Sequence, residues 1–200
     1  MSSILTVLMF VILLAAVGVL YTDGLWSNAI RLINVVTSAL VATSFFEPVA
    51  RWLDDWQPSY TYYWDFLSLW ILFAVSMVIV TELTNRASKV KVRFIKLADQ
   101  IGGVILSAWV GWVLVCFTMT TLHAAPLACN FMFGGFQPKE RMMVGLGPDR
   151  QWLGFVQKES MGAFDRSNVF DPKADFMPNY AARRTNLEEQ VSKNGSTRVN

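Results

Sequence analysis

Residues 64–83 read WDFLSLWILFAVSMVIVTEL, with acidic residues only near the two ends, at Asp65 and Glu82. A helix needs about 20 mostly apolar residues to cross a bilayer, so this stretch predicts a membrane-spanning helix. Three further candidate spans lie at residues 4–21, 29–46 and 101–122. The first and last of these contain no charged residue, whereas the middle one includes Arg31 and several amide and hydroxyl side chains. The predicted fold class is therefore an all-α membrane protein with four transmembrane helices.

The composition of the whole chain agrees with this prediction and excludes several functions. Of the 200 residues, 54% are hydrophobic and only 16% are charged, whereas a soluble domain has about 25% charged residues. One histidine and two cysteines exclude a zinc-protease motif, a Cys-rich zinc site and a disulfide framework. No phosphate-binding glycine motif is present, and a net charge of +2 is too small for a nucleic-acid binder. We therefore predict a protein that is not an enzyme and has no cofactor, no metal and no nucleic-acid partner.

The charges are distributed in blocks that predict an orientation. Five basic residues lie between the third and fourth spans: Arg86, Lys89, Lys91, Arg93 and Lys96. Basic loops face the cytoplasm, so this loop is predicted to be cytoplasmic and both chain termini extracytoplasmic. The acidic loop at residues 47–63 agrees, but the first loop, 22–28, contains Asp23 and no basic residue. Residues 85–100 suit either an amphipathic helix on anionic lipid or a plain loop.

Two sets of residues within the spans predict helix contacts. Gly103, Ser107 and Gly111 recur every four residues, a small-residue pattern that lets helix backbones approach closely. In the second span Arg31, Asn34 and Ser38 lie on one polar face. This face is expected to avoid lipid. It predicts either helix packing through side-chain hydrogen bonds or the lining of a pore, and both interpretations stay open.

Beyond the four-helix domain at 1–123, residues 124–200 are predicted to form an extracytoplasmic tail. Proline and glycine residues recur along this tail and interrupt helices. Helical patterns are confined to about 149–158 and 179–193. The tail has too few apolar residues for a core of its own, so we expect it to dock on the membrane domain or a partner. Its last residues, from 194, are predicted to be disordered.

The chain resembles the CvpA family, named for colicin V production, over residues about 4–123. The resemblance depends on Gly24 after the first span, on Ala42 with Phe45 and Phe46, on the basic loop, and on Asp99 followed by Gly103. Gln100 and Ser107 stand where the family usually has a basic residue and a glycine. Asp23 stands where it commonly has Arg, and Ser27 and Asn28 stand where it commonly has Arg and Glu.

The resemblance implies a multi-pass protein of the bacterial inner membrane, accessory to production or export of a colicin V-like toxin and to envelope homeostasis. The expected partners are the lipid bilayer and other membrane proteins or a second copy of the chain. An alternative hypothesis is a small oligomeric channel or transporter subunit that uses the polar face of the second span.

Overall fold

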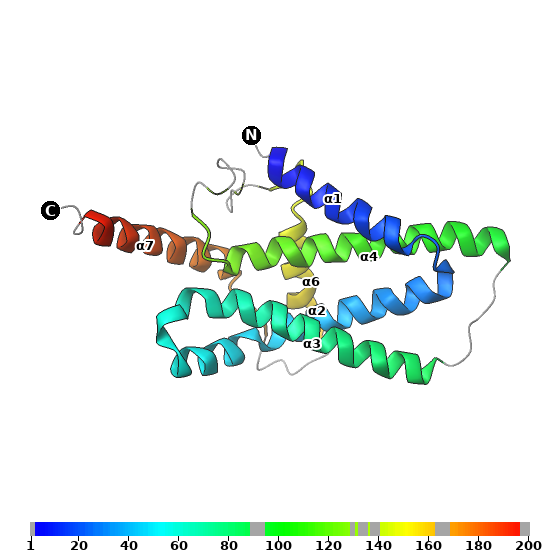
Figure 1. Cartoon of the computed structure of the whole chain (residues 1–200), viewed down its shortest axis with the longest axis horizontal. Coiled ribbons are helices and arrows are strands. Elements are labelled where there is room, and N and C mark those ends of the chain that lie inside the picture. The colour runs from blue at the N-terminus through cyan, green and yellow to red at the C-terminus, as the bar shows by residue number, and fades with distance from the viewer. Residues whose placement is uncertain are drawn as a thin grey trace.

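Every regular element in the described part of the chain is a helix. A computed structural model describes residues 3–88, 95–128, 131, 136, 141–162 and 169–196. Its elements are α1 (Ser3–Leu20), α2 (Gly24–Trp56), the 3-10 helix η1 (Pro58–Tyr60), α3 (Thr61–Ala87), α4 (Lys96–Ala124), α6 (Pro148–Gly162) and α7 (Phe176–Ser196) (Figure 1). The predicted all-α membrane fold is confirmed.

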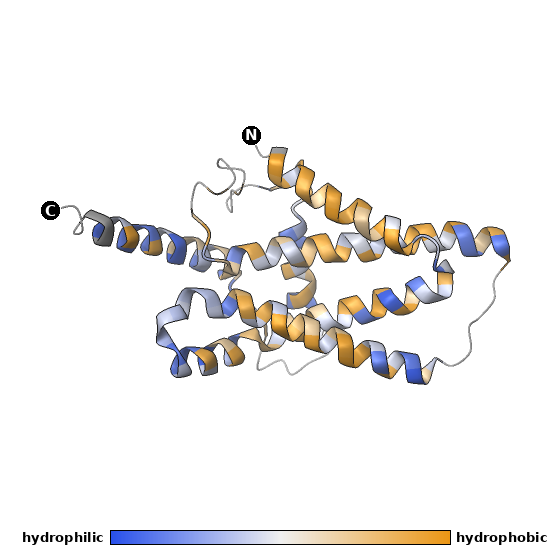
Figure 2. Cartoon of the chain, in the orientation of Figure 1, coloured by the Kyte–Doolittle hydropathy of each residue, from blue (hydrophilic) through white to orange (hydrophobic). Residues whose placement is uncertain are grey.

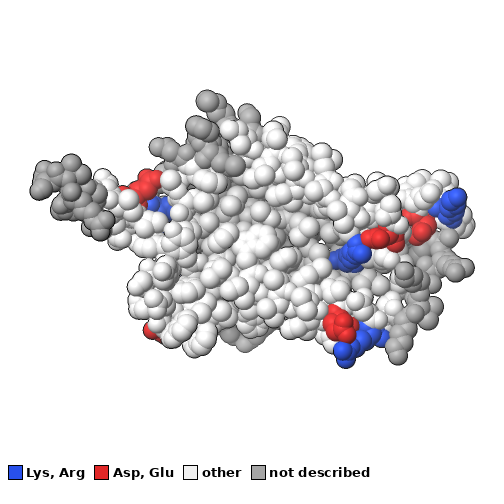
Figure 3. Space-filling view, viewed as in Figure 1, with Lys and Arg blue, Asp and Glu red and all other residues white. Residues whose placement is uncertain are grey.

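Three of these helices, α2, α3 and α4, are long and apolar enough to cross a membrane, and α1 is a shorter apolar helix. At ~1.5 Å per residue, the 18 residues of α1 span about 27 Å, close to the thickness of a hydrocarbon core. Hydrophobic residues dominate the middle of these helices in Figure 2. On the face shown in Figure 3, charged side chains gather toward the two ends. The chain is therefore a membrane protein with an apolar belt.

The second helix is much longer than the apolar run predicted at 29–46. Helix α2 has 33 residues, about 50 Å at ~1.5 Å per residue, and it continues past Pro48 into the acidic loop. Hydropathy detects only the part that lies in lipid, whereas a helix outside the bilayer can be held by polar pairs. Arg51 and Glu47 form such a pair one turn apart, with 2.9 Å between Nη2 and Oε2. Helix α3 likewise extends beyond 64–83, and Arg86 pairs with Glu82 at 2.7 Å.

The helices pack around α4. Helix α1 packs on α4, while α2 packs on both α3 and α4. One core cluster joins α1 to α4 through Leu5, Met9, Val115 and Met119. Both chain ends lie toward the same end of the bundle, opposite the end where α3 finishes and α4 begins (Figure 1).

The tail contributes to the main core. Trp152, Leu153 and Val156 of α6 are buried with Phe117 of α4 and Phe46 of α2. The rings of Phe117 and Trp152 meet edge to face at 6.1 Å between centroids. The Trp152 indole N–H donates to Thr43 Oγ1 at 3.1 Å. Helix α6 crosses the bundle beside α4 rather than standing apart from it (Figure 1).

Both tail helices are longer than their sequence patterns. Helix α6 runs from Pro148 to Gly162 and α7 from Phe176 to Ser196, beyond the predicted 149–158 and 179–193. Helix α7 therefore includes the first of the residues predicted to be disordered, and 197–200 lie outside the described residues. In the segment 85–100, α3 ends at Ala87 and α4 begins at Lys96. Residues 89–94, where an amphipathic helix was one prediction, lie outside the described residues.

Candidate functional site

Gly24 begins α2 in a conformation that requires glycine. Its φ angle is +78°, in the left-handed region that side chains disfavour. A Cβ atom placed on Gly24 would lie 2.9 Å from Asp99 Oδ2 and 3.0 Å from Oδ1. The turn between α1 and α2 is therefore shaped to receive a carboxylate from α4.

Asp99 closes the N-terminal end of α2. Its Oδ1 accepts a hydrogen bond from the Leu25 backbone N–H at 2.8 Å. Asp23, the residue that precedes α2, makes no capping bond with its side chain. A helix N-terminus presents free N–H groups and a partial positive charge, so a carboxylate there is stabilising. Asp99 also lies in the first turn of its own helix, so its negative charge stabilises the N-terminal ends of both α4 and α2.

Gly103 allows the two helices to touch at this point. A Cβ atom on Gly103 would lie 3.2 Å from the Gly24 carbonyl carbon and 3.3 Å from its Cα. Asn28 completes the contact: its Nδ2 donates to Leu20 O at 2.9 Å and to Gly103 O at 3.0 Å. We call Gly24, Asn28, Asp99 and Gly103 the glycine junction. It joins the end of α1, the start of α2 and the start of α4.

The other two small residues of α4 lie further along the helix. A Cβ atom on Gly111 would lie 2.9 Å from Leu13 Cδ1 and 3.1 Å from Leu13 O, so α1 packs directly on this glycine. Ser107 is buried, and its hydroxyl donates to Val104 O at 2.8 Å. In this structure Gly103 and Gly111 of α4 therefore contact other helices of the same chain, and Ser107 lies buried between them.

The polar face of α2 is divided between two environments. Asn34 Nδ2 donates to Thr84 Oγ1 at 3.0 Å, and Ser38 Oγ lies 3.8 Å from Met77 Sδ; both side chains are buried against α3. Arg31 instead forms an ion pair with Asp23 beside the glycine junction. The two buried groups thus have partners on a neighbouring helix, which favours the packing interpretation over the pore.

Two of the five basic loop residues are described, and both lie at the junction end of the bundle. Arg86 pairs with Glu82 near the end of α3, and Lys96 begins α4. The Trp26 indole N–H donates to Ser88 Oγ at 3.1 Å, which ties the end of α3 to the start of α2. Lys89, Lys91 and Arg93 lie outside the described residues.

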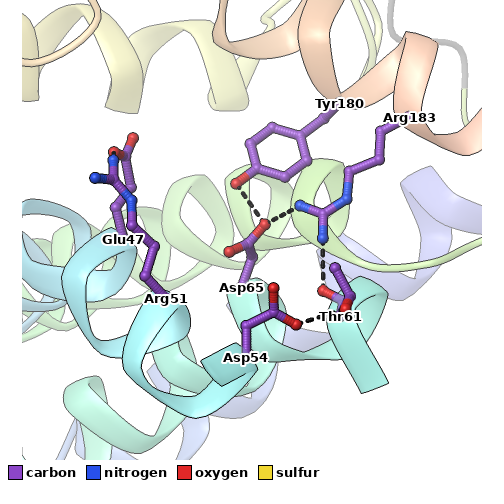
Figure 4. A network of polar contacts seen from close by, with 7 residues as sticks. All are labelled: Glu47, Arg51, Asp54, Thr61, Asp65, Tyr180 and Arg183. Atoms are coloured by element: carbon purple, nitrogen blue, oxygen red, sulfur yellow. Dashed lines mark hydrogen bonds and ion pairs between the residues drawn. The ribbon is translucent and has the colours of Figure 1, made fainter. Parts of the chain in front are cut away.

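Sequence reasoning missed a polar network at the other end of the bundle (Figure 4). Asp65 of α3 forms an ion pair with Arg183 of α7, and its Oδ2 accepts a hydrogen bond from the Tyr180 hydroxyl at 3.0 Å. Burial raises the pKa of Tyr180 well above its ordinary value, and the Asp65 charge adds to this, so the hydroxyl stays a donor. Arg183 also donates to Thr61 O. Asp65 and Tyr180 are 115 residues apart in sequence, so no local pattern marks the network.

A second missed feature is a fully buried pair between α4 and the tail. His123 Nε2 and Asp149 Oδ2 are 2.9 Å apart, and both side chains have 0% exposure. His123 lies in the last turn of α4 and Asp149 in the first turn of α6. The C-terminal end of a helix favours a positive charge, and the N-terminal end favours a negative charge. A histidine in the last turn of one helix and an acidic residue in the first turn of the next are the sequence signal that could have suggested this contact.

Comparisons with known proteins give one finding. The family model described as colicin V production protein matches residues 5–131. No curated protein and no solved structure matches the chain. The matched range covers α1 to α4 and contains the whole glycine junction.

Proposed function

The chain belongs to the colicin V production protein family, and on that premise we propose that it is a non-enzymatic accessory protein of the bacterial inner membrane. In this role it supports the production or export of a colicin V-like toxin and the upkeep of the cell envelope. The observation that carries the proposal is the family match over the entire four-helix region.

The contacts of the bundle suggest how it would act. The glycine junction and the α1–α4 contact at Gly111 hold α1, α2 and α4 at close range, and α3 packs on α2, which supports a scaffold role. Meanwhile α1 and α3 leave many apolar side chains exposed, including Val11, Leu14, Val78 and Ile79. In a membrane these faces meet lipid or other helices. We propose that a larger membrane assembly, or a second copy, packs there.

We propose an orientation with the glycine junction on the cytoplasmic side and the termini outside. The cluster of basic residues at 86–96 supports it. The alternative, a channel lined by the polar face of α2, is not the function we propose, because Asn34 and Ser38 are buried against α3.

Complementation tests the proposed role. The chain is expressed in a colicin V-producing bacterium that lacks its own family member, and released toxin is measured as growth inhibition of a sensitive strain. We expect the native chain to restore release and Gly103→Leu, which wedges α4 from α2, to reduce it severely. Gly154→Leu in α6 is the matched control, because the space beside Gly154 is open and this residue lies outside the α1 and α3 faces. Both variants are compared at equal membrane levels.

A second measurement addresses the partner. Purification of the native chain in mild detergent is expected to recover a stoichiometric membrane partner or a homo-oligomer. A native chain that fails to restore toxin release, and that purifies as a monomer without a partner, would contradict the proposal.

A further inference from the structure

A small polar pocket opens between the α2–α3 hairpin and the docked tail. Its volume is about 280 Å³. It is lined by Glu47, Ala50, Arg51, Asp54, Thr61, Trp64, Asp65, Tyr180 and Arg183. This is slightly below the ~300 Å³ at which pockets for drug-sized ligands begin, so the space suits a small head group. We call it the hairpin pocket.

The charges around the hairpin pocket are not balanced. Both guanidinium groups are already paired, Arg51 with Glu47 and Arg183 with Asp65. The third carboxylate, Asp54, accepts a hydrogen bond only from the neutral hydroxyl of Thr61 among the described residues. The pocket therefore has one carboxylate charge in excess, which favours a cation over an anion.

Two carboxylate oxygens are oriented to receive that cation. Asp65 uses Oδ2 for both Tyr180 and Arg183, and Figure 4 shows its other oxygen turned toward the side of Glu47 and Arg51. Asp54 uses Oδ1 for Thr61, and its other oxygen points toward Asp65 in the same view. Within the described residues, neither of these oxygens accepts a hydrogen bond.

The lining distinguishes an organic cation from a metal ion. Across the described ranges, no three acidic, histidine or cysteine side chains converge closely enough to hold a metal. Instead, the aromatic residues Trp64 and Tyr180 line the pocket together with the carboxylates. Aromatic rings attract ammonium groups, and an ammonium donates three hydrogen bonds that carboxylate oxygens accept.

We propose that the hairpin pocket binds a protonated primary amine, with Asp54 and Asp65 accepting its hydrogen bonds and Trp64 and Tyr180 flanking it. The pocket lies at the end of the spans, where Trp56 and Tyr63 of the hairpin are exposed. The amine can therefore come from a lipid head group in the adjacent leaflet or from a soluble molecule. This inference is independent of the proposed export role, since it concerns binding by the purified protein.

The test uses the full chain in nanodiscs made only of phosphatidylglycerol, titrated calorimetrically with ethanolamine. We expect saturable binding, no binding of the uncharged N-acetylethanolamine, and affinity weakened at least about tenfold by Asp54→Asn. Asp55→Asn is the matched control, because it removes the same charge from the next residue, which does not line the pocket. Glu47→Gln, on the opposite wall, is the second variant if Asp54→Asn does not fold.

A lipid arm identifies the source. Phosphatidylethanolamine is added to the nanodiscs, and lipid retained by the protein is measured by native mass spectrometry. If the native protein retains phosphatidylethanolamine, Asp54→Asn abolishes this retention and the lipid displaces ethanolamine, the bound amine is a lipid head group and the proposal is supported. Ethanolamine binding unaffected by the lipid supports it with a soluble amine. Three outcomes would overturn it: no binding of either probe, equal binding of N-acetylethanolamine, or equal losses in Asp54→Asn and Asp55→Asn.

Discussion

At the scale of single residues, the glycine junction depends on the absence of side chains. Gly24 has a positive φ and sits against the Asp99 carboxylate, while Gly103 touches the Gly24 backbone. A residue of any other type at Gly24 must strain the backbone and displace the carboxylate that caps α2.

We therefore expect Gly24→Ala to destabilise the protein by about 1–3 kcal/mol, the cost of strained backbone at one residue. Thermal unfolding in detergent measures this. Gly18→Ala makes the same chemical change in α1 where nothing lies within 4 Å of the new Cβ atom, and it is expected to leave the midpoint unchanged or slightly raised. Equal midpoints for the two variants would contradict the role of Gly24.

The buried pair of His123 and Asp149 gives a second prediction at this scale. His123→Ala leaves the Asp149 carboxylate in the core without its partner, and loss of one member of such a pair costs about 3–5 kcal/mol. The double variant His123→Leu with Asp149→Leu removes both polar groups and is expected to recover much of the loss. Thermal unfolding measures both effects, and the single variants His123→Leu and Asp149→Leu complete a double-mutant cycle with the double variant. Additive losses would show that the two residues are not coupled.

At the scale of elements, α7 is held to the hairpin by polar contacts. Arg183 reaches Asp65 and Thr61, and its guanidinium lies 5.2 Å from the centre of the Tyr62 ring. Phe176 anchors the start of the helix in the core, but the second half of α7 is largely exposed. Arg183 thus provides several of the contacts that hold this helix to the hairpin.

Arg183→Gln is expected to speed amide hydrogen exchange in α7 about tenfold, because it removes charged hydrogen bonds of about 1.5 kcal/mol. Exchange is followed by mass spectrometry on the full chain in nanodiscs. Glu189→Gln changes an exposed residue of the same helix and is expected to have little effect. If α7 exchanges at the native rate in Arg183→Gln, the arginine does not hold the tail.

The predicted boundaries of the helices show what hydropathy can and cannot find. The apolar runs located α1, α3 and α4 closely because lipid contact selects apolar side chains. They underestimated α2, whose last turns are polar and lie beyond Pro48. The helical pattern at about 149–158 falls within α6, but it could not show that three apolar residues of this helix are buried in a core that the bundle supplies.

At the scale of the whole molecule, the charge blocks predict one orientation. Alkaline phosphatase, which is active only outside the cytoplasm, is fused in turn after Ser88 and after Asn200. The fusion after Asn200 is expected to be active, and the one after Ser88 inactive, because the basic loop stays in the cytoplasm. The reverse pattern would mean that the protein has the opposite orientation in the membrane, with the hairpin pocket on the cytoplasmic side.

The candidate site was only partly accessible to sequence reasoning. Gly24, Asp99 and Gly103 were recognisable as family positions, yet only the structure shows that they form one contact. The sequence shows Asp65 only as an acidic residue near one end of its span, and its partner Arg183 carries no local signal. The sequence places Asn34 and Ser38 on one face, but it could not say whether that face meets α3 or a pore.

The sequence by itself determined that this is a membrane protein, where its apolar spans lie and which family it belongs to. These properties depend on residues near one another in the chain, because insertion into lipid is a sum over a local stretch. Only the tertiary structure decided that Asp99 caps a different helix, that the tail completes the core and that the α2–α3 hairpin and α7 together form the hairpin pocket. Those outcomes depend on close contacts between distant residues, which no local pattern specifies.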